Sequence, residues 1–150
     1  MSTDEIAKKE AYISVNSLIH APVEEVWPFV AAVGIEKLWY HGCTKSTASG
    51  GPGKGAIRVM QFPHGLYTER IEDCDPTTHR FVYKLLQPHD VPAKDPFGVI
   101  QLEQVGTDVT KVTWTAYADS WGQEAKAVMG ERLSQTYENS ISALRKICEA

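Results

Sequence analysis

One short stretch decides the fold: Ile19-His20-Ala21-Pro22-Val23-Glu24-Glu25-Val26-Trp27. It ends a segment, residues 12–20, in which apolar and polar side chains alternate with the period of a half-buried β-strand. Proline disfavours a continued strand because it lacks the backbone N–H and restricts the residue before it. Beyond it, apolar residues recur at positions 23, 26, 27 and 30, which is helical spacing. The sequence therefore predicts a strand followed directly by a short helix, which Pro28 should kink or shorten.

The remainder of the chain predicts a run of strands and then one long helix. A second short segment covers residues 35–40, and the glycine-rich residues 49–55 form a turn without the signature of a phosphate-binding loop. Strand patterns follow at residues 56–62, 66–74, 79–87, 97–105 and 109–118. Residues 123–150 contain no proline and repeat apolar side chains at helical spacing. A curved antiparallel sheet covered by one such helix leaves a space between them.

The composition is that of an ordinary globular chain. Of the 150 residues, 43% are hydrophobic and 23% are charged, close to the averages for folded proteins. We therefore expect a single domain over residues 1–150. The net charge is −4 and the basic residues are scattered rather than clustered, which argues against a nucleic-acid partner.

Membrane, secretion and metal signals are missing from the sequence. No window approaches the roughly 18 apolar residues that a span needs, and residues 1–10 are polar and charged. Cys43, Cys74 and Cys148 are too widely spaced to indicate a disulfide framework or a zinc cage, and His41 with Cys43 falls short of a metal site. We expect a cytoplasmic protein, a monomer or a homodimer, without metal or cofactor.

The order of these elements, with the stretch at residues 19–27, resembles the Bet v 1-like family, also named START or SRPBCC, in its polyketide cyclase/dehydrase-like branch. Four further fragments carry the resemblance: Gly55-Ala56-Ile57-Arg58, Thr68-Glu69-Arg70-Ile71, residues 112–119 and residues 137–146. The resemblance implies an α+β helix-grip fold. In that fold a seven-stranded antiparallel sheet wraps around a long C-terminal helix, two short helices follow the first strand, and a cavity holds a small hydrophobic molecule.

The resemblance also implies that Arg58 and Glu69, on adjacent strands, point into that cavity. A buried carboxylate is costly without a partner. The pair therefore either hydrogen-bonds the polar end of a ligand or forms a structural ion pair, and the sequence leaves both interpretations open. His64 lies in a loop at the expected cavity mouth, as does His89, and an imidazole there is a candidate acid or base.

Large apolar side chains supply the expected cavity lining. The candidates for ligand contact are Trp39, Met60, Phe62, Tyr67, Phe97, Trp114, Met129 and Tyr137. Because aromatic residues also fill ordinary cores, we expect part of this set to be core rather than lining.

Two functions fit these features. The first is binding of a small hydrophobic or amphipathic molecule, as in a carrier or sensor. The alternative is a cofactor-free polyketide cyclase or dehydratase, in which Glu69, Arg58 and His64 move protons on a bound substrate. Convergence of those three side chains within hydrogen-bond distance favours the enzyme, whereas an apolar space with one polar end favours the carrier. Binding of a protein through the long helix ranks last, because the core already needs its apolar face.

Overall fold

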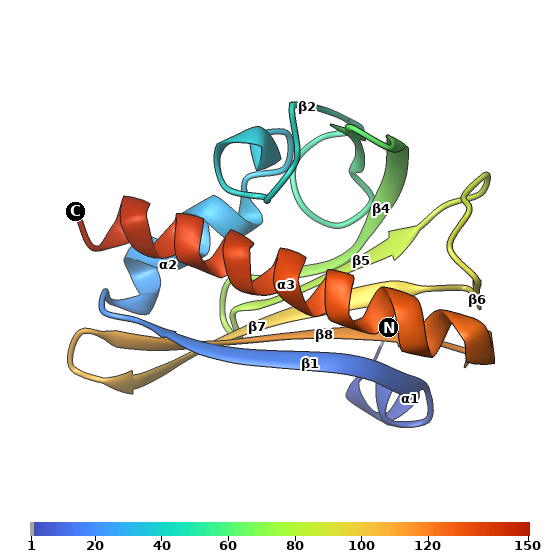
Figure 1. Cartoon of the computed structure of the whole chain (residues 1–150). Coiled ribbons are helices and arrows are strands. Elements are labelled where there is room, and N and C mark those ends of the chain that lie inside the picture. The colour runs from blue at the N-terminus through green and yellow to red at the C-terminus, as the bar shows by residue number, and fades with distance from the viewer. Residues whose placement is uncertain (1) are drawn as a thin grey trace.

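The computed structural model describes residues 2–150, apart from the side chains of residues 124–127. In chain order, the elements are α1 (Thr3–Ala7), β1 (Glu10–Ile19), α2 (Val23–Ala31), the 3-10 helix η1 (Glu36–Leu38), β2 (Lys45–Ser49), β3 (Ile57–Phe62), β4 (Gly65–Asp75), β5 (Arg80–Leu85), β6 (Ala93–Lys94), β7 (Phe97–Gly106), β8 (Val109–Ala118), β9 (Ser120–Trp121) and α3 (Gln123–Cys148) (Figure 1).

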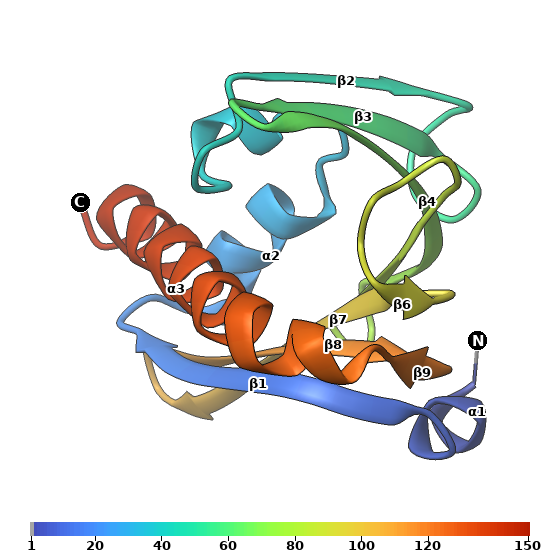
Figure 2. The same cartoon turned by 45° about the vertical axis from the view of Figure 1, so that its right-hand side comes forward.

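The larger sheet is antiparallel and has seven strands in the order β1-β8-β7-β5-β4-β3-β2. Figure 2 shows it curling from β1 and β8, through β4, to β3 and β2, with α2 and α3 inside the curve. β6 and β9 pair separately as a small ribbon. This arrangement confirms the expected helix-grip fold, with its long C-terminal helix and two short helices after the first strand.

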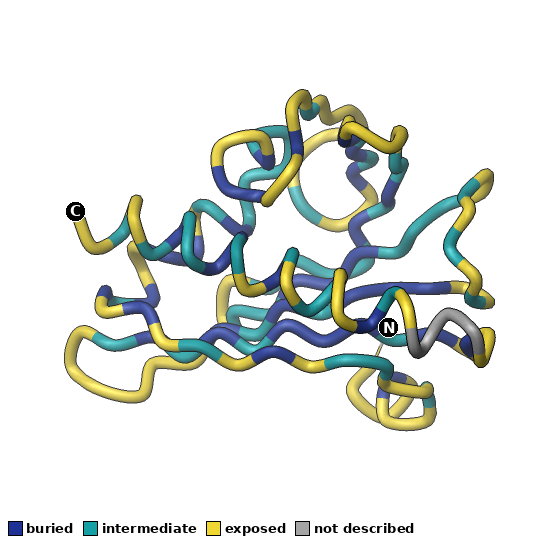
Figure 3. The backbone as a smooth tube through the Cα atoms, in the orientation of Figure 1, coloured by how far each residue is buried: buried dark blue, intermediate teal, exposed yellow. Residues whose placement is uncertain are grey.

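The face of the sheet that meets α3 is apolar, because a strand sends alternate side chains to the same face. Val15 on β1 pairs with Trp114 on β8, and both side chains are buried. Tyr137, Ile141 and Leu144 form one buried stripe along α3. Figure 3 shows buried segments where the strands, α2 and α3 face one another, and exposed backbone at the hairpins.

The strand β2 was not found by the sequence pattern. Its residues, Lys-Ser-Thr-Ala-Ser, are polar or small and mostly exposed, and it pairs with β3 alone at the edge of the sheet. The Ser46 hydroxyl donates to the Gly34 carbonyl at 2.8 Å and accepts from the Lys37 N–H at 3.1 Å. Polar contacts with the η1 turn, rather than apolar burial, therefore hold this strand, and a hydrophobic period does not reveal it.

The first of the two short helices covers its whole predicted pattern, whereas the second is shorter than expected. Pro28 lies inside α2, which ends at Ala31, and the Ala32 N–H donates to the Pro28 carbonyl. The segment expected at residues 35–40 is a single 3-10 turn, η1. Among the described helices, none combines the length and the hydropathy that crossing a lipid bilayer requires.

Candidate functional site

A cavity of about 760 Å³ lies between the curved sheet and α3. Its wall is built by β3, β4, β5, β7, β8, α3 and the loops at the open end of the sheet. The volume falls within the usual range for small-molecule sites. Aromatic and aliphatic side chains dominate the wall, and four tyrosines contribute to it: Tyr40, Tyr67, Tyr83 and Tyr137. The cavity is thus a mainly apolar space with hydroxyl groups in its wall.

The structure brings most of the expected lining residues to this wall. Those that line it are Met60, Phe62, Tyr67, Phe97, Met129 and Tyr137. They come from β3, β4, β7 and α3, which are far apart in the sequence. Their contact with a ligand stays a prediction.

Trp39 and Trp114 lie behind the wall, in the core, rather than in the lining where we expected them. Trp114 is completely buried and stacks on Tyr137, with ring centroids 4.1 Å apart and planes at 10°. Trp39 packs on Trp114 at 5.8 Å and is also buried. Both side chains therefore support the ring that faces the cavity.

Three large aromatic residues of the wall were missed. Tyr83 follows the inward alternation of β5, so its pattern was a usable signal. Tyr40 lies in an irregular loop after η1, where no period exists. That loop is fixed by the His41 N–H, which donates to the Ser140 hydroxyl of α3 at 2.8 Å. Trp121 belongs to the two-residue strand β9, too short for a periodic pattern.

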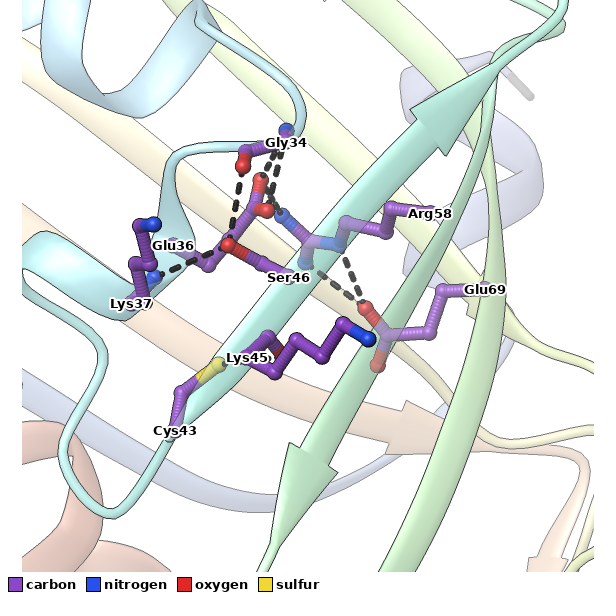
Figure 4. Close-up of polar contacts among 8 residues, drawn as sticks. All are labelled: Gly34, Glu36, Lys37, Cys43, Lys45, Ser46, Arg58 and Glu69. Carbon is purple, nitrogen blue, oxygen red and sulfur yellow. Dashed lines mark hydrogen bonds and ion pairs between the residues drawn. The ribbon is translucent and has the colours of Figure 1, made fainter.

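Behind one part of the wall, Arg58 joins two carboxylates (Figure 4). Arg58 on β3 pairs in register with Glu69 on β4, and its Nε donates to Glu69 Oε1 at 2.8 Å. The Arg58 Nη1 group donates to Glu36 Oε2 at 3.3 Å. Both oxygens of Glu36 also accept from the Gly34 N–H, at 2.9 and 3.1 Å. These contacts bind β3, β4 and the η1 turn together.

The three members of this cluster differ in their access to the cavity. Arg58, Glu36 and Glu69 are 0%, 1% and 5% exposed, yet only Glu69 is part of the cavity wall. The Arg58 guanidinium lies over the rings of Phe81 and Tyr83, at 5.2 and 4.8 Å from their centroids. Arg58 was expected to face the ligand, but the structure places it behind Glu69. Glu36 was missed, because a single acidic residue in a polar turn gives no pattern.

Burial and charge act in opposite directions on this cluster. Burial alone would lower the pKa of Arg58, but the Glu69 and Glu36 carboxylates raise that pKa above its ordinary value. Arg58 is therefore permanently charged. Burial raises the pKa of Glu69, and the neighbouring Arg58 charge only partly offsets this effect. Glu69 is thus a carboxyl group whose ionised form is costly and depends on its partner.

Phenol groups surround the inner part of the cavity. The Trp114 Nε1–H donates to the Tyr83 hydroxyl at 2.8 Å, and the Tyr83 and Tyr137 hydroxyls are 3.2 Å apart. The bond between the two phenols uses one of their two protons, which leaves one O–H for another acceptor. Burial raises the pKa of Tyr83 to about 12 and that of Tyr40 and Tyr137 well above the usual value, so all three stay neutral.

His64 lies in the wall but away from the carboxylate cluster. It is exposed in the hairpin between β3 and β4, and it stacks on Phe62 and contacts Tyr67, with centroids 5.7 and 5.5 Å apart. Among the described residues, no hydrogen bond joins it to Arg58 or Glu69. His89 bonds to Gln87 instead. The expected acid/base set therefore does not converge here.

In residues 2–150, apart from the side chains of 124–127, His, Cys, Asp and Glu side chains do not gather in a group of three suited to a metal ion. The titratable side chains that line the cavity are those of Glu69, Asp90, Arg132, the tyrosines and the histidines at its mouth.

Comparison with known proteins places this geometry among related folds. The family described as "Polyketide cyclase / dehydrase and lipid transport" matches residues 11–149. The structure of the protein XoxI from Bacillus cereus is similar with a TM-score of 0.78 and 17% identity, covering 93% of this chain and 96% of that one. A START superfamily protein from Mycobacterium smegmatis is similar with a TM-score of 0.70 and 15% identity, covering 93% and 98%.

A two-domain protein is also similar. The di-domain ARO/CYC BexL from the BE-7585A biosynthetic pathway has a TM-score of 0.73 and 18% identity, over 89% of this chain and 45% of that one. At such identities these structural likenesses show the fold alone. No curated protein matches the sequence.

Proposed function

Because the chain belongs to the polyketide cyclase/dehydrase and lipid transport family, we propose that it binds a small hydrophobic or amphipathic molecule in the cavity, as a carrier or sensor. The observation that carries this proposal is the distribution of apolar and charged side chains in the cavity wall. Aromatic and aliphatic side chains form most of the wall, and among the described residues the one buried charged group that reaches it is the carboxyl of Glu69. An apolar molecule with one polar end suits such a space.

The arrangement of the acid/base groups supports binding over catalysis. A catalyst of the cyclase type needs a proton donor and acceptor within hydrogen-bond reach of the reacting atoms. Here Arg58 forms ion pairs with two carboxylates behind the wall, and His64 stacks on the Phe62 ring at the mouth. Glu69 is left as a single anchoring group rather than as part of a proton relay.

The cyclase alternative rests on one specific observation. Burial raises the pKa of Glu69, and the neutral phenols of Tyr40 and Tyr83 lie close enough to Glu69 that its charge raises their pKa values further. A carboxyl group with a raised pKa beside phenol donors is suited to proton transfer on an enolising substrate. In that case Glu69 would be the acid or base, and the phenols would hold a carbonyl oxygen.

Native mass spectrometry of freshly purified protein tests the binding proposal. We expect the wild type to carry a co-purified small molecule. Leu133→Trp adds bulk in the cavity wall and should abolish this extra mass, whereas Leu38→Trp, at an exposed position of η1 outside the wall, should retain it. Equal loading of the two variants would contradict binding in this cavity.

A single-turnover incubation separates carrier from enzyme. The extracted molecule is returned to the protein, and its mass is followed over time in the wild type and in Glu69→Gln. An unchanged mass supports the carrier proposal. Conversion by the wild type but not by Glu69→Gln favours the cyclase alternative.

A further inference from the structure

The buried ion cluster contains more acidic than basic side chains. It joins the carboxylates of Glu36 and Glu69 to the single guanidinium of Arg58. With both carboxylates ionised, two negative charges face one positive charge, so one negative charge is left over. Among the described residues, Arg58 is the only cationic side chain in the buried set. An uncompensated charge in an apolar interior is costly, so a positive group from outside the chain would stabilise the cluster.

The position of Glu69 directs this unbalanced charge into the cavity. Its Oε1 atom receives both Arg58 contacts, from Nε at 2.8 Å and from Nη2 at 2.7 Å. Its second oxygen, Oε2, has no hydrogen bond among the described residues, and the side chain is part of the wall. An ionised carboxylate can only accept hydrogen bonds. A ligand that satisfies this oxygen must therefore bring a donor.

The neighbouring wall also suits a cation. Tyr40, Tyr83 and Tyr137 line the cavity together with Glu69, and each is neutral because burial raises its pKa, an effect to which the nearby Glu69 charge adds. Aromatic rings attract cations through their faces, as the Arg58 guanidinium above the Tyr83 ring shows at this end of the cavity. The phenol oxygens can accept further N–H bonds. An anionic ligand group would instead meet the Glu69 charge.

The other charged groups of the wall do not cancel this preference. Asp90 and Arg132 also line the cavity, but both are exposed and of opposite sign. Exposed charges are screened by water and salt, so their effect on a ligand at Glu69 is small. The selection of ligand charge therefore rests with the buried cluster.

We propose that the ligand of this cavity is an apolar, ring-containing molecule with a protonated amine at its inner end, which Glu69 holds as counter-ion. The inference rests on the proposed binding function and names its ligand class. The ammonium group donates to Glu69 Oε2 and to the phenol oxygens, while the ring system lies against the aromatic wall. Glu36 and Arg58 hold Glu69 in place from behind.

Four naphthalene probes of similar size test this inference by isothermal titration calorimetry. They are 2-(2-naphthyl)ethylamine, 2-(2-naphthyl)ethanol, 2-naphthylacetic acid and 2-ethylnaphthalene. At pH 7 the amine should bind about tenfold more tightly than the alcohol, the difference between a charge-assisted and a neutral hydrogen bond. The acid should bind most weakly. In Glu69→Gln the advantage of the amine should disappear, whereas the matched change Glu103→Gln, at an exposed position of β7 outside the cavity wall, should preserve it.

The outcomes separate this inference from the binding function. The inference is overturned if the alcohol or the acid binds as tightly as the amine, or if Glu69→Gln retains the preference for the amine. In either case, binding of 2-ethylnaphthalene still supports the proposed function of an apolar carrier. If none of the four probes binds, the proposed function fails and the inference fails with it. Should Glu69→Gln not fold, as judged by circular dichroism, the order of the four probes on the wild type decides.

Discussion

Gly98 is the position where the smallest change should disturb the cavity most. It lies on β7, directly opposite Tyr83 on β5, and the tyrosine ring crosses over it. A Cβ atom at residue 98 would lie 2.2 Å from both Cζ and the hydroxyl oxygen of Tyr83, and 2.7 Å from Cε1. Real Cβ atoms do not approach other atoms so closely, so Gly98→Ala must displace the ring.

The cost of that displacement can be worked out from the contacts of Tyr83. Its ring supports the Arg58 guanidinium at 4.8 Å, and its hydroxyl accepts from the buried Trp114 indole at 2.8 Å. Overpacking a core costs about 1 to 3 kcal/mol, and a lost buried hydrogen bond adds about 1 kcal/mol, so we expect a loss of about 2 to 4 kcal/mol. With the usual unfolding entropy for a chain of this length, Tm falls by roughly 6 to 13 °C.

Thermal unfolding followed by circular dichroism measures this loss. Gly106→Ala is the matched control, because it lies on the same strand and its Cβ would meet only Val109 atoms at 3.5 Å, an ordinary contact. We expect its Tm to stay near that of the wild type. The double variant Gly98→Ala/Tyr83→Leu should lose less stability than the two single changes together, because the smaller side chain relieves the clash. A Tm of Gly98→Ala equal to that of the wild type would refute the reasoning.

Three further predictions concern the core and the buried polar groups. Trp114→Ala should destabilise the fold by about 3 to 5 kcal/mol, because a fully buried aromatic side chain is truncated; an unchanged urea midpoint would show the burial to be wrong. Arg58→Met should cost about 3 to 5 kcal/mol by leaving two buried carboxylates unpaired, and the double variant with Glu69→Gln should be less destabilised than the sum; strictly additive urea midpoints would mean that the two residues do not interact. Stability should fall as the pH rises from about 10 towards 12, because tyrosines in the unfolded chain ionise near pH 10. In the folded chain, burial raises the pKa of Tyr83 to about 12 and also raises the pKa values of Tyr40 and Tyr137. Urea midpoints at pH 8 to 11 check this dependence, and Tyr137→Phe should make it shallower.

The sequence predicted the elements that bury an apolar face. β8 was located at its observed bounds and β1 within two residues, because Val15, Val112 and Trp114 repeat with the strand period and face the core. The same reasoning found α3, whose stripe of Tyr137, Ile141 and Leu144 has helical spacing. β2 escaped it because its serine and threonine side chains are held by hydrogen bonds and exposure, which have no periodic signature.

The sequence likewise predicted the site residues that lie on regular strands, but not those that lie in loops. Strand alternation correctly put Met60 and Phe62 on the inner face, and the family resemblance put Glu69 there. Tyr40 lies in a loop that is anchored by a hydrogen bond from the neighbouring His41 to Ser140 of α3, 99 positions away in the sequence. The local sequence contains no periodic pattern that could predict a site residue positioned by such a tertiary contact.

Arg58 shows what alternation alone does not determine. The strand period gives the face on which a side chain lies, and Arg58 does share the inner face of β3 with Met60 and Phe62. Whether that side chain reaches the cavity depends on what packs against it. At residue 58 the rings of Phe81 and Tyr83 cover the guanidinium, so the cation is shielded and only its partner Glu69 meets the cavity. The chemistry presented to a ligand is therefore that of an acceptor with a fixed counter-ion behind it, which is why the charge of the ligand, rather than the presence of the ion pair, is the quantity to measure.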